Sequence, residues 1–143
     1  MKHIIEAKWK GNLTFEVNQP GGKLILDTSE NAGGNDNGLR PKPLMISALA
    51  GCTGMDVASL LKKMRIDQDI NNFTLHVEGD LTEEHPKKYH EVKVVYTFEG
   101  TQLDRKKIEK AVNLSIEKYC GVYEMFRSFA KVTHEIVYRE ITV

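Results

Sequence analysis

The longest apolar stretch of the chain covers residues 41–65 and reads PKPLMISALAGCTGMDVASLLKKMR. Pro43 suits the first turn of a helix, because its missing N–H would make no helical hydrogen bond there. The basic residues near its end, Lys62, Lys63 and Arg65, suit the negative end of a helix. The apolar side chains point in nearly all directions at 100° per residue, which predicts burial on most sides. We therefore expect a central helix over residues 43–65.

This stretch is too short, and too interrupted by Asp56 and the lysines, for the run of about twenty apolar residues that a membrane span needs. We expect a core helix of a soluble domain instead. Small side chains let a second helix backbone come close, which explains glycines at positions where they cost about 1 kcal/mol of helix stability. The small residues in question are Ser47, Ala48, Gly51, Gly54 and Ala58.

The length and charge of the chain narrow its class. Its 143 residues predict one domain, residues 1–143, with a core of its own. Twenty basic and twenty acidic residues balance, which indicates neither a nucleic acid nor an anionic membrane as partner. The first residues, MKHIIEAKWKG, lack the apolar core of a signal peptide, so we expect a cytoplasmic protein.

The segments on both sides of the central helix alternate apolar and polar residues, which predicts half-buried strands. Three short strands at 5–10, 13–18 and 23–28 come first, followed by a Gly- and Asn-rich loop at 29–39. A hairpin at 73–77 and 92–98 follows the helix, then a helix at 104–120 with Asp104 as N-cap and Gly121 at its end. A short amphipathic segment at 122–129 and a strand at 132–143 complete an α+β fold.

The two cysteines, Cys52 and Cys120, lie 68 positions apart and neither belongs to a CxxC pair. This spacing predicts no cysteine zinc site, and a reducing cytosol favours no static disulfide. His85 and His90 have no partner at ligand spacing, so we expect no metal and no cofactor. Two interpretations stay open: the cysteines are buried free thiols, or they carry redox chemistry.

Asp56 follows Cys52 by one helical turn and shares its face. Its carboxylate can accept a hydrogen bond from the thiol, but its charge raises the pKa of a neighbouring thiol, so a reactive Cys52 needs a cation. Arg40 and Lys42 are the nearest cations in sequence, and they reach Cys52 only if the loop folds back or a second subunit contributes. Asp56 equally suits a structural role, as a buried carboxylate that caps or cross-links backbone.

Cys120 lies at the C-terminus of its predicted helix, where the negative end of the helix dipole disfavours a thiolate. It is therefore a poor attacking group. Such a thiol suits the role of a resolving cysteine, which condenses with a sulfenic acid formed on another cysteine. This asymmetry predicts Cys52 as the residue that attacks a peroxide.

The pattern PKPLMISALAGCTGMDVASLLKKMR, followed by EKYCGVYEMF and a final strand, resembles the osmotically inducible protein C and organic hydroperoxide resistance (OsmC/Ohr) family, especially its OsmC-like branch. The resemblance implies an intertwined α+β homodimer with antiparallel sheets around long central helices and an active site at the subunit interface. It also implies catalysis by Cys52 and Cys120. Asp56, from its place on the helix face, and Arg40, from its proximity in sequence, are candidate supporting residues. A dithiol, typically on a lipoyl protein, is the implied reductant.

Peroxidases of that family have an arginine from the N-terminal strands and a glutamate shortly before the attacking cysteine. This chain has lysines in those strands and no acid in residues 40–43. Two hypotheses follow: a thiol peroxidase for organic hydroperoxides in oxidative stress defence, and a non-catalytic dimer that binds an apolar small molecule. The candidate walls for an alkyl chain are Met45, Met125, Phe126 and Phe129, which equally suit an ordinary core.

Overall fold

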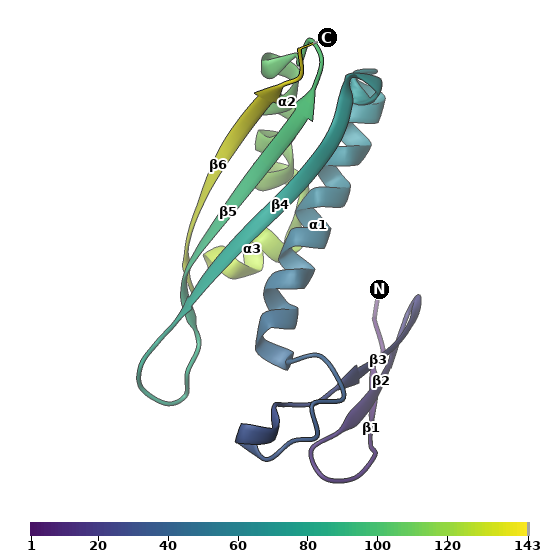
Figure 1. Ribbon diagram of the computed structural model, residues 1–143, viewed down its shortest axis with the longest axis vertical. Helices are drawn as coiled ribbons and strands as arrows, with labels where there is room; N and C mark the ends of the chain where they lie inside the picture. Colours follow the sequence, from purple (N-terminus) through teal and green to yellow (C-terminus); the bar gives the residue numbers. More distant parts are fainter. Residues whose placement is uncertain (143) are drawn as a thin grey trace. The chain divides into compact units, whose positions relative to one another are not determined.

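The computed structural model describes residues 1–142, which form two compact units, Met1–Met45 and the chain from Ile46 onward. The N-terminal unit contains β1 (Glu6–Trp9), β2 (Phe15–Gln19) and β3 (Gly22–Leu26). They pair antiparallel in the order β1-β2-β3 (Figure 1). The three strands predicted before the central helix are thus confirmed.

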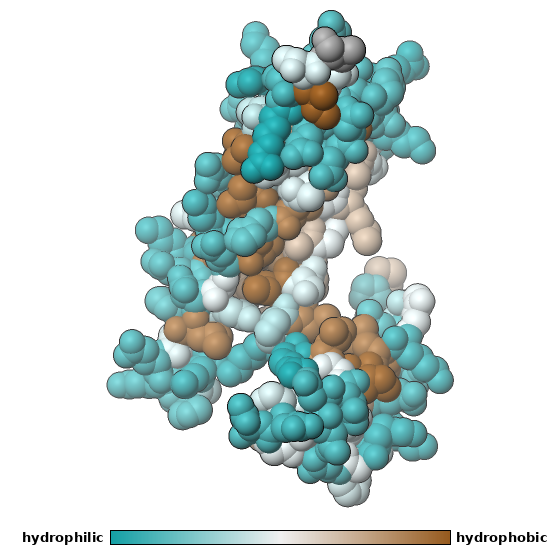
Figure 2. Space-filling view, in the orientation of Figure 1, coloured by the Kyte–Doolittle hydropathy of each residue, from teal (hydrophilic) through white to brown (hydrophobic). Residues whose placement is uncertain are grey.

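The sheet of the N-terminal unit has little interior of its own. Val17 is the buried apolar residue among its described residues. Phe15 pairs directly with Trp9 and with Leu26, so these three share one face. Trp9 is nevertheless 64% exposed, and Figure 2 shows apolar side chains on the surface of this unit. Three short strands need an apolar face packed against something to be stable, and this unit does not supply the cover itself.

The loop at 29–39 is held in place by a buried carboxylate. Asp27 accepts hydrogen bonds from the backbone N–H of Thr28 at 2.8 Å and of Asn37 at 3.1 Å, and from Thr14 Oγ1 at 3.0 Å. Burial alone would raise the pKa of Asp27, but these hydrogen bonds outweigh it and leave the pKa below its ordinary value. The predicted loop is confirmed, with one short 3-10 turn, η1 (Glu30–Ala32), and Asp27 gives it a defined shape.

The long helix α1 (Pro41–Lys63) confirms the predicted central helix, shifted by two residues. Its buried residues form a single stripe with a spacing of four: Leu49, Thr53, Val57 and Leu61. The expectation of burial on most sides is therefore wrong for one chain, because the sheet of the second unit covers only one face of the helix. No described atom lies within 4 Å of a Cβ placed on Gly51, and a Cβ placed on Gly54 would meet the side chain of Leu75, which lies in a strand, so neither glycine receives a crossing helix from the same chain.

By length and composition alone, α1 is the one helix among residues 1–142 that is long and apolar enough to cross a membrane. The expectation that the stretch is too short is corrected, since 23 residues in a helix span about 35 Å. We interpret α1 as a core helix, because its buried stripe packs in the core cluster of the second unit.

The second unit has a mixed sheet in the order β4-β5-β6. A short 3-10 turn, η2 (Asp67–Asp69), leads from α1 into β4 (Ile70–Leu81), which forms the predicted antiparallel hairpin with β5 (Tyr89–Gly100). β6 (Lys131–Glu140), however, runs parallel to β5, whereas antiparallel sheets were expected. The reason is the long helical crossover between them, which returns the chain to the end of the sheet where β5 began.

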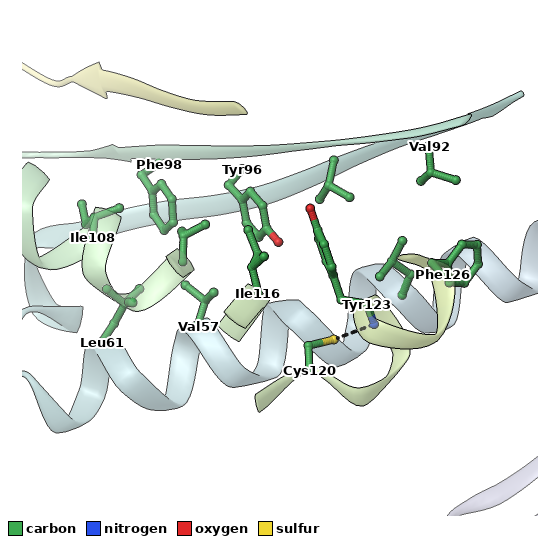
Figure 3. Packing of buried hydrophobic residues seen from close by; sticks show 14 of the residues in the cluster. Val57, Leu61, Val92, Tyr96, Phe98, Ile108, Ile116, Cys120, Tyr123 and Phe126 are labelled. Carbon is green, nitrogen blue, oxygen red and sulfur yellow. Dashed lines mark hydrogen bonds between the residues drawn. The ribbon is translucent and has the colours of Figure 1, made fainter. Parts of the chain in front are cut away.

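The crossover consists of α2 (Arg105–Leu114), the π-helix η3 (Ser115–Tyr119) and α3 (Gly121–Arg127). Asp104 is the N-cap of α2, as predicted, and accepts from the Lys107 N–H at 3.1 Å. The predicted continuous helix over 104–120 is corrected, because the chain widens into a π-helix at Ser115, and Gly121 begins α3. The three helices lie on one face of the sheet, from which Tyr96 and Phe98 point toward them (Figures 1 and 3).

Candidate thiol site

The structure brings both cysteines and Asp56 together. Cys52 and Asp56 lie one turn apart on α1, and Cys120 lies between η3 and α3. The two sulfur atoms and a carboxylate oxygen of Asp56 are all within 4.8 Å of one another. Cys52 and Asp56 are half-buried, Cys120 is buried, and both cysteines are free thiols. Three of the four candidate site residues thus form one cluster.

Two backbone hydrogen bonds fix the position of Cys120. Its N–H donates to the carbonyl oxygen of Ser115 at 2.8 Å and closes the wide turn of η3. Its sulfur then accepts from the N–H of Tyr123 at 3.3 Å as the N-cap of α3. The expectation that Cys120 faces only the negative end of a helix is corrected, because its sulfur also accepts from an N–H in the first turn of the next helix.

Arg127 holds the segments on both sides of Cys120. Its guanidinium donates to the carbonyl oxygen of Ile116 and lies 3.9 Å from the Glu117 carboxylate, both in η3. It also lies 3.6 Å from the carboxylate of Glu124 in α3. One side chain therefore joins η3 to α3, and Cys120 lies at the junction.

Burial is the main reason why the pKa of Cys120 is raised to about 12. The neighbouring Cys52 and the charge of Asp56 act in the same direction, and the hydrogen bond from the Tyr123 N–H acts against them. Cys120 is thus protonated at neutral pH. It is a poor attacking group, as the sequence predicts, but the main cause is burial and not a helix dipole.

A chain of buried hydrogen bonds ends on Asp56. The hydroxyl of Thr53 lies 2.8 Å from the Tyr96 hydroxyl and 2.8 Å from Ser115 Oγ, which donates to Asp56 Oδ2 at 3.2 Å. A carboxylate only accepts, so Ser115 donates its one hydroxyl proton to Asp56 and must accept a hydrogen bond from Thr53. Thr53 has then donated its own proton and must accept a hydrogen bond from Tyr96. The order of donation is therefore Tyr96 to Thr53 to Ser115 to Asp56. Burial raises the pKa of Tyr96, which keeps the first donor protonated.

Sequence reasoning missed the roles of Thr53, Ser115 and Tyr96, although two of them left a signal. Thr53 interrupts an otherwise apolar stripe on α1, and Ser115 falls on the apolar face of the helix predicted at 104–120. Both are fully buried. Because buried hydroxyls almost always find partners, a polar residue in an apolar stripe indicates a buried network.

A surface cleft of about 250 Å³ reaches the site from outside. It exposes the carboxylate side of the cluster, and Lys63, on the last turn of α1, contributes a positive charge to it. As cations that could act on Cys52, the sequence predicted only Arg40 and Lys42, which come before the helix. The cleft is lined by Asp56, Ser59, Leu60, Lys63 and Tyr119.

The fourth candidate, Arg40, belongs to the N-terminal unit. Its guanidinium donates to the carbonyl oxygen of Gly38 at 2.7 Å and pairs with the carboxylate of Asp36 at 2.5 Å. These contacts fix Arg40 to the loop that leads into α1. Its action on Cys52 stays a prediction.

The four candidate walls of an alkyl site differ in exposure. Phe126 is fully buried, packs near Tyr89 and Phe129, and belongs to the hydrophobic core. Met125 and Phe129 are exposed, and the exposed Met45 belongs to the N-terminal unit. Met45, Met125 and Phe129 thus offer apolar surface, whereas Phe126 is core.

Known proteins with this fold supply the context for the cluster. Protein YhfA of Escherichia coli (strain K12) is 32% identical over 128 residues, which is 90% of this chain and 92% of that protein. A hypothetical protein from Aquifex aeolicus VF5 superimposes with a TM-score of 0.78 at 28% identity, over 97% of this chain and 98% of that one. The organic hydroperoxide resistance protein OhrB of Bacillus subtilis has a TM-score of 0.64 at 20% identity, over 95% and 98%.

The family model described as OsmC-like protein matches residues 33–135. This match includes α1, the crossover helices and therefore every residue of the thiol cluster. It agrees with the resemblance that the GCTGMDV segment and the later KYC carry in the sequence. The chain belongs to the OsmC-like protein family.

Proposed function

We propose that this chain is a cysteine-based thiol peroxidase that reduces organic hydroperoxides in oxidative stress defence. The observation that carries the proposal is the approach of Cys52, Cys120 and Asp56 to within 4.8 Å. Cys52 is the less buried of the two cysteines. The fold shared with a hydroperoxide resistance protein is consistent with this chemistry.

The reaction uses the two sulfurs in sequence. The Cys52 thiolate attacks the terminal oxygen of the hydroperoxide, the O–O bond breaks, and the alkoxide leaves and takes up a proton as the alcohol. Cys52 is then a sulfenic acid. The Cys120 sulfur attacks the Cys52 sulfur, the S–O bond breaks, and the hydroxyl leaves with the Cys120 proton as water. One hydroperoxide has become one alcohol and one water, and two thiols have become a disulfide.

A dithiol, with a lipoyl protein as the candidate, completes the proposed cycle. One of its thiolates attacks the Cys52–Cys120 disulfide, and its second thiol releases the mixed disulfide, so that the dithiol leaves as a disulfide and both cysteines are thiols again. Such a cycle requires a pool of reduced dithiols, which is why we propose a cytoplasmic location.

The proposal is tested by treating the reduced protein with one equivalent of cumene hydroperoxide and mapping its cysteines by mass spectrometry. We expect a Cys52–Cys120 disulfide, with loss of two hydrogens from the intact mass. The Cys120 sulfur lies within 4.8 Å of the Cys52 sulfur, so resolution should outrun further oxidation.

Cys120→Ser is the matched control for that experiment. It should stop at a Cys52 sulfenic acid, which dimedone labels, because no second thiol is within reach. A wild-type protein that keeps two free thiols after exposure to peroxide would instead support the second hypothesis, a non-catalytic dimer that binds an apolar small molecule. One observation favours that second hypothesis: within residues 1–142, no described ion pair joins a lysine or arginine to Asp56.

The proposed peroxidase works as a homodimer. The N-terminal sheet exposes an apolar face, and α1 buries only one stripe although it is apolar over most of its length. Gly51 faces open space within the described chain. Uncovered apolar surface on this scale marks an interaction site, and a second copy is the occupant that the family resemblance implies.

Light scattering after size exclusion should give twice the chain mass of 16.2 kDa. Gly51→Arg should shift the protein toward monomer, because a long charged side chain would fill the space that a second copy needs, whereas Gly51→Ala should leave the mass unchanged. If nothing packs at Gly51, the arginine variant keeps its oligomeric state and gains up to about 0.8 kcal/mol of helix stability. That result would place the interface elsewhere.

A further inference from the structure

The thiol cluster also has the composition of a metal site. Two thiols and one carboxylate are the donor types that thiophilic divalent ions take, and zinc accepts this combination. Within residues 1–142, this is the one group of three or more His, Cys, Asp and Glu side chains whose donor atoms gather so closely. We propose that the reduced Cys52–Asp56–Cys120 cluster binds one zinc ion.

The distances suit zinc after a small movement. Ligands at about 2.3 Å for sulfur and about 2.1 Å for oxygen lie roughly 3.5–3.8 Å apart around a tetrahedral ion. The three donor atoms are within 4.8 Å of one another. Even if all three distances had this value, each donor atom would need to move only about half an ångström toward the centre of the triangle to reach zinc distances. Cys52 and Asp56 lie one turn apart on one face of a helix, which holds their spacing rigid.

The surroundings of Asp56 resemble the outer shell of a metal site. Ser115 donates to Oδ2 of the carboxylate at 3.2 Å, and it is itself held by Thr53 at 2.8 Å. This bond orients the carboxylate and leaves Oδ1 for an ion. A cleft of about 250 Å³ reaches Asp56 from the surface, which supplies an entry path and room for water as a fourth ligand.

Charge explains why an ion would be taken up by the reduced cluster. Two sulfurs and the carboxylate of Asp56 lie within 4.8 Å of one another in a largely buried place, where their negative charges would repel one another. A divalent cation offsets these charges, so that both thiols release their protons to solvent as the ion binds. A disulfide has no thiolate to offer. Zinc binding and the Cys52–Cys120 disulfide therefore exclude each other, and zinc should protect the thiols from peroxide.

Cobalt(II) is the probe, because thiolate-bound cobalt absorbs strongly in the near ultraviolet. We expect the anaerobic, reduced protein to develop this charge-transfer band with one cobalt per chain, and zinc to remove it by displacement. Wild-type protein oxidised to the disulfide should show no band, which tests the site without any substitution. Absence of the band from the reduced protein, or the same cobalt affinity after oxidation, would overturn the proposal.

Variants separate the three-ligand site from adventitious binding to a pair of thiols. Asp56→Asn should weaken cobalt binding by at least about 10-fold, and Ser115→Ala by about 10-fold through the loss of its hydrogen bond to Asp56. Ser59→Ala, in the same cleft but one turn from Asp56, should bind as the wild type does. Unchanged affinity in Asp56→Asn would contradict the site. These readouts need no peroxidase activity, so the zinc site stands or falls independently of the proposed reaction.

Discussion

Cys52→Ser should lower the rate of cumene hydroperoxide consumption by at least about 10³-fold, the scale on which enzymes lose activity when their nucleophile is removed. A serine hydroxyl is a far weaker nucleophile than a thiolate at neutral pH, and Cys120 cannot replace it. Burial raises the pKa of Cys120 to about 12, so almost none of it is ionised. The measurement is the loss of hydroperoxide over time in the presence of excess dithiol.

Cys120→Ser is the control that distinguishes the roles of the two sulfurs. It keeps the attacking residue, so the first turnover should proceed near the wild-type rate. Later turnovers should fail as the unresolved Cys52 sulfenic acid oxidises further to the sulfinic acid. If Cys52→Ser consumes peroxide as fast as the wild type, the proposed peroxidase is wrong.

The fold could be predicted to a large extent because most of its helices and strands have a recognisable pattern of residues within their own segment. Alternating residues gave the strands, and the long apolar run gave α1. The parallel pairing of β6 with β5 could not be predicted from such patterns, because a strand's direction depends on the crossover before it. The π-helix at Ser115 was equally hidden, because the buried residues that lead into it, Ile108, Ala111, Val112 and Ser115, keep the spacing of an ordinary α-helix.

The site could be predicted only in part, because its residues come from two separate elements of the fold. Cys52 and Asp56 share a helix face, which residue spacing alone reveals, but Cys120 reaches them only through the junction of η3 and α3. The sequence predicted no metal site because it offered no closely spaced ligand motif. Ligands from two separate elements leave no such motif, so only their placement in space carries that proposal.

Thr53→Val should destabilise the protein by about 2–3 kcal/mol although the two side chains have the same shape. The valine removes both 2.8 Å hydrogen bonds and leaves the buried Tyr96 hydroxyl without an acceptor. Tyr96→Phe should lower the free energy of unfolding by about 1 kcal/mol, because it removes a donor and leaves only a lone pair of the Thr53 oxygen without a partner. The measurement is urea unfolding at one protein concentration, compared at equal m values.

The double variant tests whether Tyr96 and Thr53 are coupled through their hydrogen bond. With Tyr96→Phe added, Thr53→Val no longer leaves an orphaned donor, so the double variant should be more stable than Thr53→Val alone, with a coupling of about 1 kcal/mol or more. Thr74→Val, an exposed position on β4, is the matched control and should stay within about 0.5 kcal/mol of wild type. Additive effects of the two buried substitutions would show that Tyr96 and Thr53 are not joined by this hydrogen bond. The single variants test the order of donation: if Thr53 donated to Tyr96, Tyr96→Phe would leave the buried donor and would be the costlier substitution, which would contradict the order set by Asp56.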